Sequence, residues 1–354
     1  MQAERSDRIV ANWILLGIVM LIIQVLLGGI TRLTGSGLSI TEWKPIMGAL
    51  PPINQTDWER AFSKYQQIAQ YKFLNTHFSL SEFKFIFFWE WFHRLWARII
   101  GVVFLIPFIY FLVKKYFKSW MIVPLIILFL LGAMQGAIGW IMVQSGLNES
   151  DLYVSHIRLA AHFIAAMVLI AYALVFWLRM KVPSQNIVVQ PALKYWAVTI
   201  MFLLVIQLIY GAFMAGLKAA PVAPTWPSIN GMWFLPSFFP DGLNSIFHNK
   251  IAIHFVHRNL AYLLVVLIII WWWKAKNISY SRDFNLARNL VITFVLLQVA
   301  LGIITVLTSQ KIVAGKFGVY EWMAQLHQLV GMLLFLSLVA VLYLTRAKKQ
   351  ASRI

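Results

Sequence analysis

The chain has 354 residues, of which 61% are hydrophobic and only 12% are charged. A soluble domain carries roughly 25% charged residues, so this composition excludes an ordinary soluble protein. The net charge of +18 does not indicate a nucleic-acid partner, because the cations lie between long apolar runs and form no compact basic domain. The chain has no cysteine, which excludes disulfides and thiolate chemistry. Ligands for a metal or cofactor must therefore be histidine, methionine, tyrosine or carboxylate side chains.

Eight apolar runs are long enough to cross the ~30 Å hydrocarbon core of a bilayer. They must be helical, because backbone polar groups inside lipid have no water to bond. The predicted fold class is therefore all-α integral membrane. No small-residue cleavage site follows the first run, so we expect a retained first helix. The predicted spans are 13–32, 88–113, 121–143, 158–178, 195–216, 253–273, 289–308 and 324–345.

The cations predict which side of the membrane each connection faces. Sixteen Lys and Arg residues lie in the N-terminus, the C-terminal tail and every second connection, whereas the short connections between these carry few. Cytoplasmic segments are enriched in Lys and Arg, so both termini are expected in the cytoplasm of a bacterial inner-membrane protein. The sixteen are Arg5, Arg8, Lys114, Lys115, Lys118, Arg179, Lys181, Lys194, Lys274, Lys276, Arg282, Arg288, Arg346, Lys348, Lys349 and Arg353.

The second half of the chain repeats the first, at offsets of 183 residues for the first span and 163 to 165 for the later ones. Each half has four spans, so both halves have the same orientation. We expect two tandem four-helix bundles, residues 1–185 and 186–354, related by a pseudo-two-fold axis along the membrane normal. The matching residues are Gln24 with Gln207, Gly28 with Gly211, Trp43 with Trp226, His93 with His257, Gln135 with Gln298, Gly139 with Gly302, and His162 with His327.

Two outer loops carry structural signals of their own. Residues 56–59 match a capping box, and behind them Trp58, Phe62 and Tyr65 lie on one face of a predicted helix. That helix either lies on the membrane surface or packs on the bundle. The loop at 221–240 is rich in Pro, Trp and Phe, so we expect an ordered lid.

Four of the eight histidines occupy alternate spans. His93, His162, His257 and His327 stand 17 to 21 residues before the first cytoplasmic cation of their spans. That separation is about 26–32 Å in a helix, which predicts one shared depth near the outer edge of the core. Ionisable groups inside a bilayer are costly and usually functional. Two imidazoles from facing helices can hold a heme iron, whereas zinc usually has three or four ligands. The predicted pairs are His93 with His162, and His257 with His327.

Arginines near these histidines suit the two propionates of a heme. Arg94 and Arg258 directly follow a histidine, Arg98 lies one turn further, and Arg158 shares a helix face with His162. A guanidinium binds a carboxylate with two hydrogen bonds. The alternative is that these side chains extend to the outer surface. We expect propionate contact for at least two of them.

One half carries a carboxylate that the other lacks. Glu90 lies three residues before His93 and on the same helix face, and its equivalent in the second half is His254. A carboxylate beside a heme can relay protons or act as an acid or base. The alternative is an ion pair with Arg94 or Arg158. The asymmetry predicts that the halves diverged into one working site and one supporting site.

Five segments match one known family, in the family's order and over nearly the whole chain. They are GGITRLTGSGLSITEWKPIMGALPP at 28–52, SEFKFIFFWEWFHR at 81–94, RLAAHF at 158–163, HRNLAY at 257–262 and LHQ at 326–328. In these segments the chain resembles the heme A synthase family, and the first two motifs are the specific ones. Its lack of cysteine is similar to the cysteine-free, proteobacterial and mitochondrial-like branch.

The resemblance implies an oxidoreductase that converts the C8 methyl group of heme o to a formyl group, giving heme a for cytochrome oxidase assembly. It implies that His93 and His162 face the iron of the substrate heme. It also implies that His257 and His327 bind the iron of a heme b cofactor, and that Glu90 is the catalytic carboxylate. The duplicated halves of the sequence, of which only one carries Glu90, point the same way.

The expected partners are heme o, heme o synthase, membrane lipid and an electron donor, ferredoxin-like or of another type. No nucleic-acid partner is expected, and a homo-oligomer is left open. One alternative function is a diheme b-type electron-transfer cytochrome, which explains the four histidines but neither Glu90 nor the long N-terminal motifs. A second is a repeat-built transporter, which predicts broken helices at the midplane of the membrane.

Overall fold

The computed structural model describes residues 2–43, 47–234, 239–276, 281–312 and 317–346. Within these residues, eight helices are long and apolar enough to cross a membrane. The predicted all-helical, multi-pass fold class is therefore confirmed, while the pseudo-two-fold axis stays a prediction. The eight are α1 (Gln2–Leu33), α4 (Leu80–Val113), α5 (Ser119–Gln144), α6 (His156–Lys181), α7 (Pro191–Gly216), α9 (Lys250–Lys276), α10 (Arg282–Thr308) and α11 (Val319–Leu344).

Shorter helices lie in the connections. The α-helical ones are α2 (Gln55–Tyr65), α3 (Ala69–Leu74) and α8 (Ser245–His248). The 3₁₀ turns are η1 (Met47–Ala49), η2 (Ser184–Asn186), η3 (Ala220–Val222), η5 (Gly242–Asn244) and η6 (Ser309–Lys311). Parts of the sequence predictions lie outside the described residues, namely Lys348, Lys349, Arg353, positions 44–46 of the first motif and positions 235–238 of the expected lid.

Polar caps extend two spanning helices beyond their predicted starts. The second span was expected to begin at 88, but α4 begins at Leu80, where Ser79 and Glu82 form a capping box. The seventh was expected at 289, but α10 begins at Arg282, after the cap residue Ser281. Hydropathy misses these first turns, because their caps and charged residues interrupt the apolar run.

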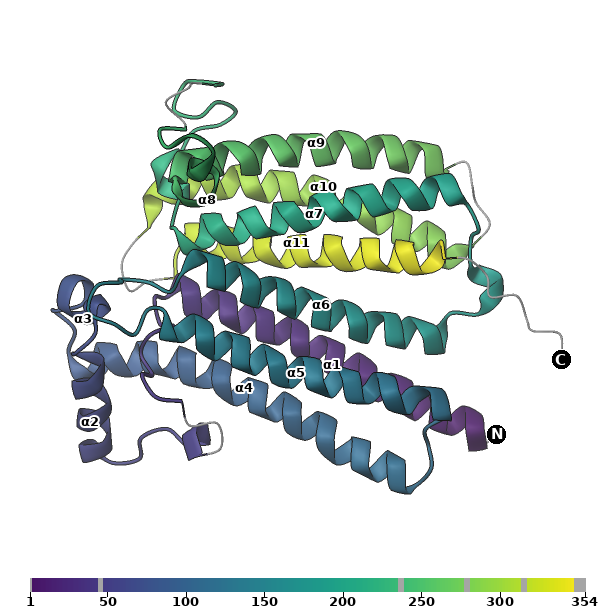
Figure 1. Cartoon of the computed structure of the whole chain (residues 1–354), viewed down its shortest axis with the longest axis horizontal. Helices are drawn as coiled ribbons and strands as arrows, with labels where there is room; N and C mark the ends of the chain where they lie inside the picture. The colour runs from purple at the N-terminus through teal and green to yellow at the C-terminus, as the bar shows by residue number, and fades with distance from the viewer. Residues whose placement is uncertain (1, 44–46, 235–238, 277–280, 313–316, 347–354) are drawn as a thin grey trace. The chain divides into compact units, whose positions relative to one another are not determined.

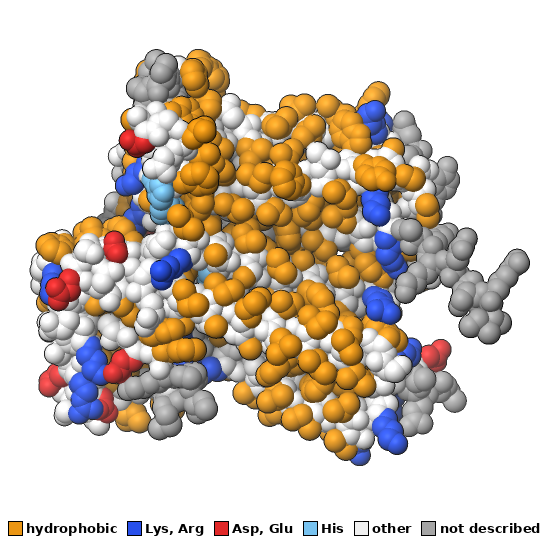
Figure 2. Space-filling view, viewed as in Figure 1, with side chains coloured by type: hydrophobic (Ala, Val, Ile, Leu, Met, Phe, Trp, Pro, Cys, Tyr) orange, Lys and Arg blue, Asp and Glu red, His pale blue; other side chains and the backbone are white. Residues whose placement is uncertain are grey.

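The chain forms two compact units, each described by itself. One holds the described residues up to Ile170 together with 317–321, and the other holds those of 171–312 and from Trp322 on. In the first, α1 packs along α4, and in the second, α9 packs along both α7 and α10 (Figure 1). Figure 2 shows hydrophobic side chains along the helices and Lys and Arg near helix ends. Each predicted histidine pair falls within one unit, whereas the division at 185/186 stays a prediction.

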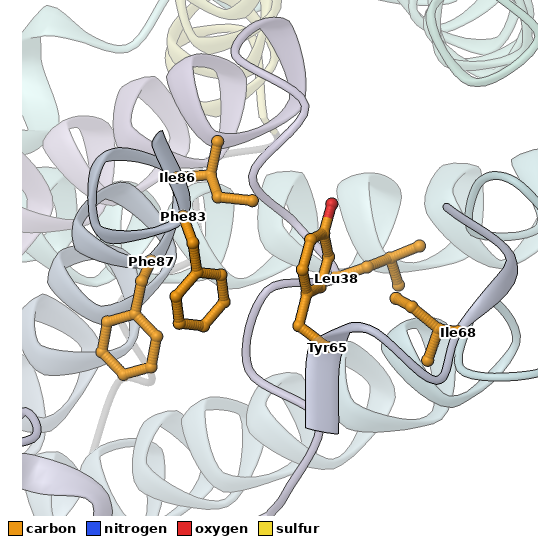
Figure 3. Packing of buried hydrophobic residues seen from close by; sticks show 6 residues of the cluster. All are labelled: Leu38, Tyr65, Ile68, Phe83, Ile86 and Phe87. Atoms are coloured by element: carbon orange, nitrogen blue, oxygen red, sulfur yellow. The ribbon is translucent and has the colours of Figure 1, made fainter. Parts of the chain in front are cut away.

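The short helix α2 packs on the N-terminal end of α4. Its Trp58 ring meets Phe87 edge-on with ring centres 5.0 Å apart, and its Phe62 ring lies 5.0 Å from Phe83. Of the two alternatives for this helix, packing on the bundle is therefore what the structure has. A cluster of buried side chains joins the helix to the bundle (Figure 3): Leu38, Tyr65, Ile68, Phe83, Ile86 and Phe87.

The predicted capping box at 56–59 is wrong. The cap residue of α2 is Asn54, whose side chain accepts a hydrogen bond of 2.9 Å from the backbone N–H of Asp57. Glu59 instead accepts from the side chain of Gln55 at 2.8 Å. Asn caps a helix at least as well as Thr, so the helix begins two residues earlier than the motif suggested.

Tyr65 gives this outer cluster a pH dependence. Its hydroxyl donates to Gln70 at 3.1 Å and accepts from Asn75 at 2.7 Å. Burial raises the pKa of Tyr65 to about 12. An unfolded tyrosine ionises near pH ~10. The contribution of Tyr65 to the free energy of unfolding should therefore be constant below that pH and fall as pH rises toward the folded pKa.

We expect Tyr65→Phe to remove this dependence and to cost about 1 kcal/mol, because two hydrogen bonds are lost. The difference between the tyrosinate absorbance titrations of wild type and variant isolates this single hydroxyl. A midpoint well above pH 10 is expected for the difference curve. A midpoint near that of a free tyrosine would contradict the described burial of Tyr65.

Candidate functional site

The structure brings the predicted histidines together in pairs. The rings of His257 and His327 meet edge-on with their centres 6.4 Å apart. A metal held between two imidazoles, about 2 Å from each nitrogen, puts the ring centres about 6 Å apart. His93 and His162 are close enough to interact electrostatically. Among the described residues, no three His, Asp or Glu side chains converge as metal ligands would, so each pair suits a metal that takes two protein ligands.

A glutamine amide lies against each of these four rings. In every case the glutamine is on the spanning helix that precedes the histidine's helix in the chain. The distances from the glutamine Nε2 atom to the nearest ring nitrogen are 3.2 Å for Gln24 to His93 Nε2, 3.2 Å for Gln135 to His162 Nδ1, 3.4 Å for Gln207 to His257 Nε2 and 3.2 Å for Gln298 to His327 Nε2.

A glycine one turn after each glutamine faces the same ring. A Cβ atom placed on these glycines would lie close to Cε1 of the histidine, so a side chain has little or no room at three of them and would make an ordinary contact at Gly211. The distances would be 3.1 Å for Gly28 to His93, 2.7 Å for Gly139 to His162, 3.4 Å for Gly211 to His257 and 2.9 Å for Gly302 to His327.

These glutamines and glycines occupy equivalent positions in the two halves of the sequence, but their contact with the histidines was not predicted. The available signal was their spacing. Residues i and i+4 share one helix face, so each Gln-x-x-x-Gly element presents both residues to the same neighbour.

Glu90 is buried, with 2% of its surface exposed, and its carboxylate is bonded on both oxygens. One oxygen accepts from the Ser39 hydroxyl at 2.7 Å and from the backbone N–H of Ile40 at 2.8 Å. The other accepts from Arg94 at 2.5 Å, so the ion pair considered from the sequence is present. Arg94 also donates to the carbonyls of Ile40 and Glu42, at 3.0 and 3.1 Å. Glu90 and Arg94 therefore tie the loop after α1 to α4.

Arg258 ties a loop to its own helix in the second unit. It donates to the carbonyls of Ala223 and Thr225, both at 2.7 Å. Its Nε donates to Nδ1 of His254 at 3.1 Å. His254, which stands where the first half has Glu90, is thus a partner of the arginine.

These loop contacts recur at equivalent positions of the repeat. Ala223 and Thr225 stand 183 residues after Ile40 and Glu42, the offset that already relates Trp226 to Trp43. The arginine that follows the first histidine of each half therefore holds two equivalent carbonyls. What differs is its side-chain partner, a carboxylate in one half and an imidazole in the other.

Arg158 lies in the first turn of α6, close to His156, which begins that helix. It donates to the carbonyl of Ile141 at 3.0 Å. Its side chain also lines an open polar hollow between α5 and α6. The lining residues are Gln144, Ser145, Asn148, Asp151, Tyr153, Ser155 and Arg158.

A family model described as COX15-CtaA, cytochrome oxidase assembly protein, matches residues 11–339 of the chain. The chain belongs to the heme A synthase family. It is 38% identical to heme A synthase of Flavobacterium johnsoniae, over 88% of this chain and 93% of that protein. It is 40% identical to the heme A synthase of Nitrosomonas eutropha, over 85% of this chain and 86% of the relative. The heme A synthase of Rhodopseudomonas palustris is 41% identical, over 85% of this chain and 81% of its own. The predicted membership of the heme A synthase family is confirmed.

The loop contacts of Arg258 can be tested without any cofactor. We expect Arg258→Lys to keep the charge but lose the multiple carbonyl contacts, because an ammonium lacks the planar fork of a guanidinium. Protease cleavage in the segment 219–234 should then become faster. Arg288→Lys is the matched control, since buried Arg288 also donates to a carbonyl, that of Ala275, away from this loop. Equal cleavage rates in the two variants would show that Arg258 does not hold the loop.

Proposed function

We propose that this chain is a heme A synthase, an oxidoreductase that oxidises the C8 methyl group of heme o to a formyl group and so gives heme a for cytochrome oxidase assembly. The observation that carries the proposal is the pair of neighbouring, half-buried histidines in each unit. It is supported by 38–41% identity to heme A synthases over most of their length.

His257 and His327 would bind the iron of a heme b cofactor, and His93 and His162 that of the substrate heme. The residues fit such a group, because the 6.4 Å ring separation suits a metal held between two imidazoles. Nδ1 of His257 is buried with no hydrogen-bond partner among the described residues, so this ring has an unused nitrogen. Bound heme supplies the oxidising and electron-transfer chemistry that the side chains of this cysteine-free chain lack.

Glu90 is proposed as the catalytic carboxylate of the first unit. It lies one turn before His93 on the same helix face, where it can accept or give a proton during oxidation of the methyl group. Ser39, Ile40 and Arg94 hold its two oxygens in a fixed orientation. The equivalent position of the other half has His254, so acid–base chemistry by a carboxylate is restricted to one site.

Arg94, Arg158 and Arg258 are proposed to bind heme propionates. Each lies within four residues of a proposed iron ligand and donates to backbone carbonyls. A carboxylate is a stronger acceptor than a carbonyl, because hydrogen bonds between charged groups are roughly twice as strong. A propionate can therefore compete with the loop carbonyls for these guanidinium groups.

We further propose a bacterial inner membrane location with both termini in the cytoplasm, on the strength of the sixteen cations described above. Residues 1–185 would then be the substrate half and 186–354 the heme b half. Heme o, which has a long apolar farnesyl tail, would arrive through the lipid from heme o synthase. Reducing equivalents would come from a ferredoxin-like or another electron donor.

The proposed function is tested by extracting hemes from membranes that contain this chain and a supply of heme o. Heme a, or hydroxylated heme o, should appear only when the chain is present. His257→Ala and His327→Ala should each lose the bound heme b, because one of its two proposed iron ligands is removed. If only heme b copurifies and heme o is unchanged despite a reductant, the diheme electron-transfer cytochrome becomes the better account.

Glu90→Gln keeps the size and most hydrogen bonds of the side chain but removes its ability to exchange a proton. We expect normal heme b content and a loss of about 100-fold or more in product formation. Ser39→Ala is the control, since it removes one donor to Glu90 while leaving the carboxylate in place. A Glu90→Gln protein with full activity would remove the catalytic assignment. Equal losses in both variants would instead indicate that Glu90 acts by holding the loop.

A further inference from the structure

We propose that the Gln-x-x-x-Gly element before each of the four histidines positions that histidine as an iron ligand. The glutamine fixes the orientation of the ring at all four histidines, and Gly28, Gly139 and Gly302 also give their rings room that a Cβ would take. The inference rests on the proposed function in one respect, because it takes these histidines to be the heme ligands. The contact between α10 and α11 shows the arrangement in most detail.

Gly302 determines how closely the His327 ring can approach α10. The three atoms nearest to a Cβ placed on Gly302 all belong to this ring, at 2.9, 3.4 and 3.8 Å. A real Cβ does not come within 3.0 Å of another atom, so even alanine would displace the ring. The close approach brings Nδ1 of His327 to 3.1 Å from the backbone carbonyl of Gln298.

The contact with Gly302 and the bond to the Gln298 carbonyl determine which ring nitrogen of His327 can bind a metal. A carbonyl only accepts hydrogen bonds, so Nδ1 of His327 carries the proton and Nε2 is left with its lone pair. Iron-ligating histidines almost always donate their other N–H to such an acceptor, which sets the tautomer and the ring orientation. The amide Nε2 of Gln298 lies 3.2 Å from this same Nε2 atom and donates to it. In the heme-free protein the glutamine thus keeps the ring neutral and oriented, and an iron that binds this nitrogen would take over the lone pair from the amide.

The two helices make room for each other's side chains. Gly331 on α11 stands one turn after His327, and a Cβ placed there would lie 3.1 Å from the amide nitrogen of Gln298. The His327 ring of α11 packs against Gly302 of α10, and the Gln298 amide of α10 packs against Gly331 of α11. The other three histidines are followed at the same spacing by alanine, the next smallest residue: Ala97, Ala166 and Ala261.

The amide oxygens argue against a mere packing role for the four glutamines. In Gln24, Gln135, Gln207 and Gln298 alike, Oε1 is buried with no hydrogen-bond partner in the described part of the chain. A buried unsatisfied acceptor costs about 1–3 kcal/mol, and an apolar side chain of the same size would avoid that cost. A cost that recurs at all four rings is accounted for if the amide has a task at the ring nitrogen.

The test compares two glycines of one unit in the purified full-length chain. A Cβ on Gly302 would meet the ring at 2.9 Å, whereas one on Gly211 would lie 3.4 Å from His257, an ordinary contact. We expect Gly302→Ala to weaken heme b binding about 10- to 100-fold, and the ferric spectrum to gain a high-spin component. Gly211→Ala should keep wild-type affinity and a low-spin spectrum. Gln298→Leu, which keeps the volume but loses the amide, should also weaken binding about 10-fold.

A double-mutant cycle of Gly302→Ala with His327→Ala distinguishes a role of Gly302 in positioning the ring from a role in helix packing. In heme-free protein, Gly302→Ala should lower the melting temperature only while the ring is present, because removing the ring removes the clash. If Gly302→Ala is equally destabilising in both backgrounds, or if it binds low-spin heme b like the wild type, the positioning role is overturned. Either result leaves the proposed function intact. By contrast, a His327→Ala protein that still binds low-spin heme b overturns the ligand assignment itself and this inference with it.

Discussion

An imidazole inside a membrane helix has no water to satisfy its two nitrogens, and the rest of the structure follows from meeting that requirement. A helix cannot do so for its own histidine, because its backbone groups are already bonded to one another. The neighbouring helix must supply both a hydrogen-bonding group and enough room to approach. In all four cases the neighbour supplies them from a single face, with a glutamine and, one turn later, a glycine. Sites for two hemes therefore require four matched helix pairs, which is the number the eight spans provide.

Much of the fold could be predicted from the sequence, because the signals for it are local. Apolar runs near twenty residues identify spans without any knowledge of their neighbours. His257 and His327 could be paired because they lie at matching positions of a repeated pattern. Helix starts were missed at α1, α4 and α10, since hydropathy treats charged first turns and polar caps such as Ser79 as interruptions of the apolar run.

The contacts of the candidate site could be predicted only in part, because they join distant segments. An ion pair of Glu90 with Arg94 was foreseeable from their spacing on one helix. Their bonds to Ile40, which stands 50 residues before Glu90, were not. Gln298 and Gly302 could be recognised because they occupy the positions of Gln135 and Gly139 in the repeat, but nothing in the local sequence indicates that they contact His327. The repeat showed that these residues matter together, and the structure supplied the physical reason.

The difference between Glu90 and His254 gives the two proposed sites different electrostatics. In the first unit the carboxylate of Glu90 balances the charge of Arg94. In the second, the partners of Arg258 among the described residues are an imidazole and backbone carbonyls, none of which adds a negative charge. An anionic propionate gains more from an uncompensated cation than from a neutralised pair. The second site is thus suited to a heme that stays bound, and the first to one that must leave after reaction. One difference at equivalent positions of the repeat therefore agrees both with the proposed place of the acid–base group and with the proposed retention of heme b.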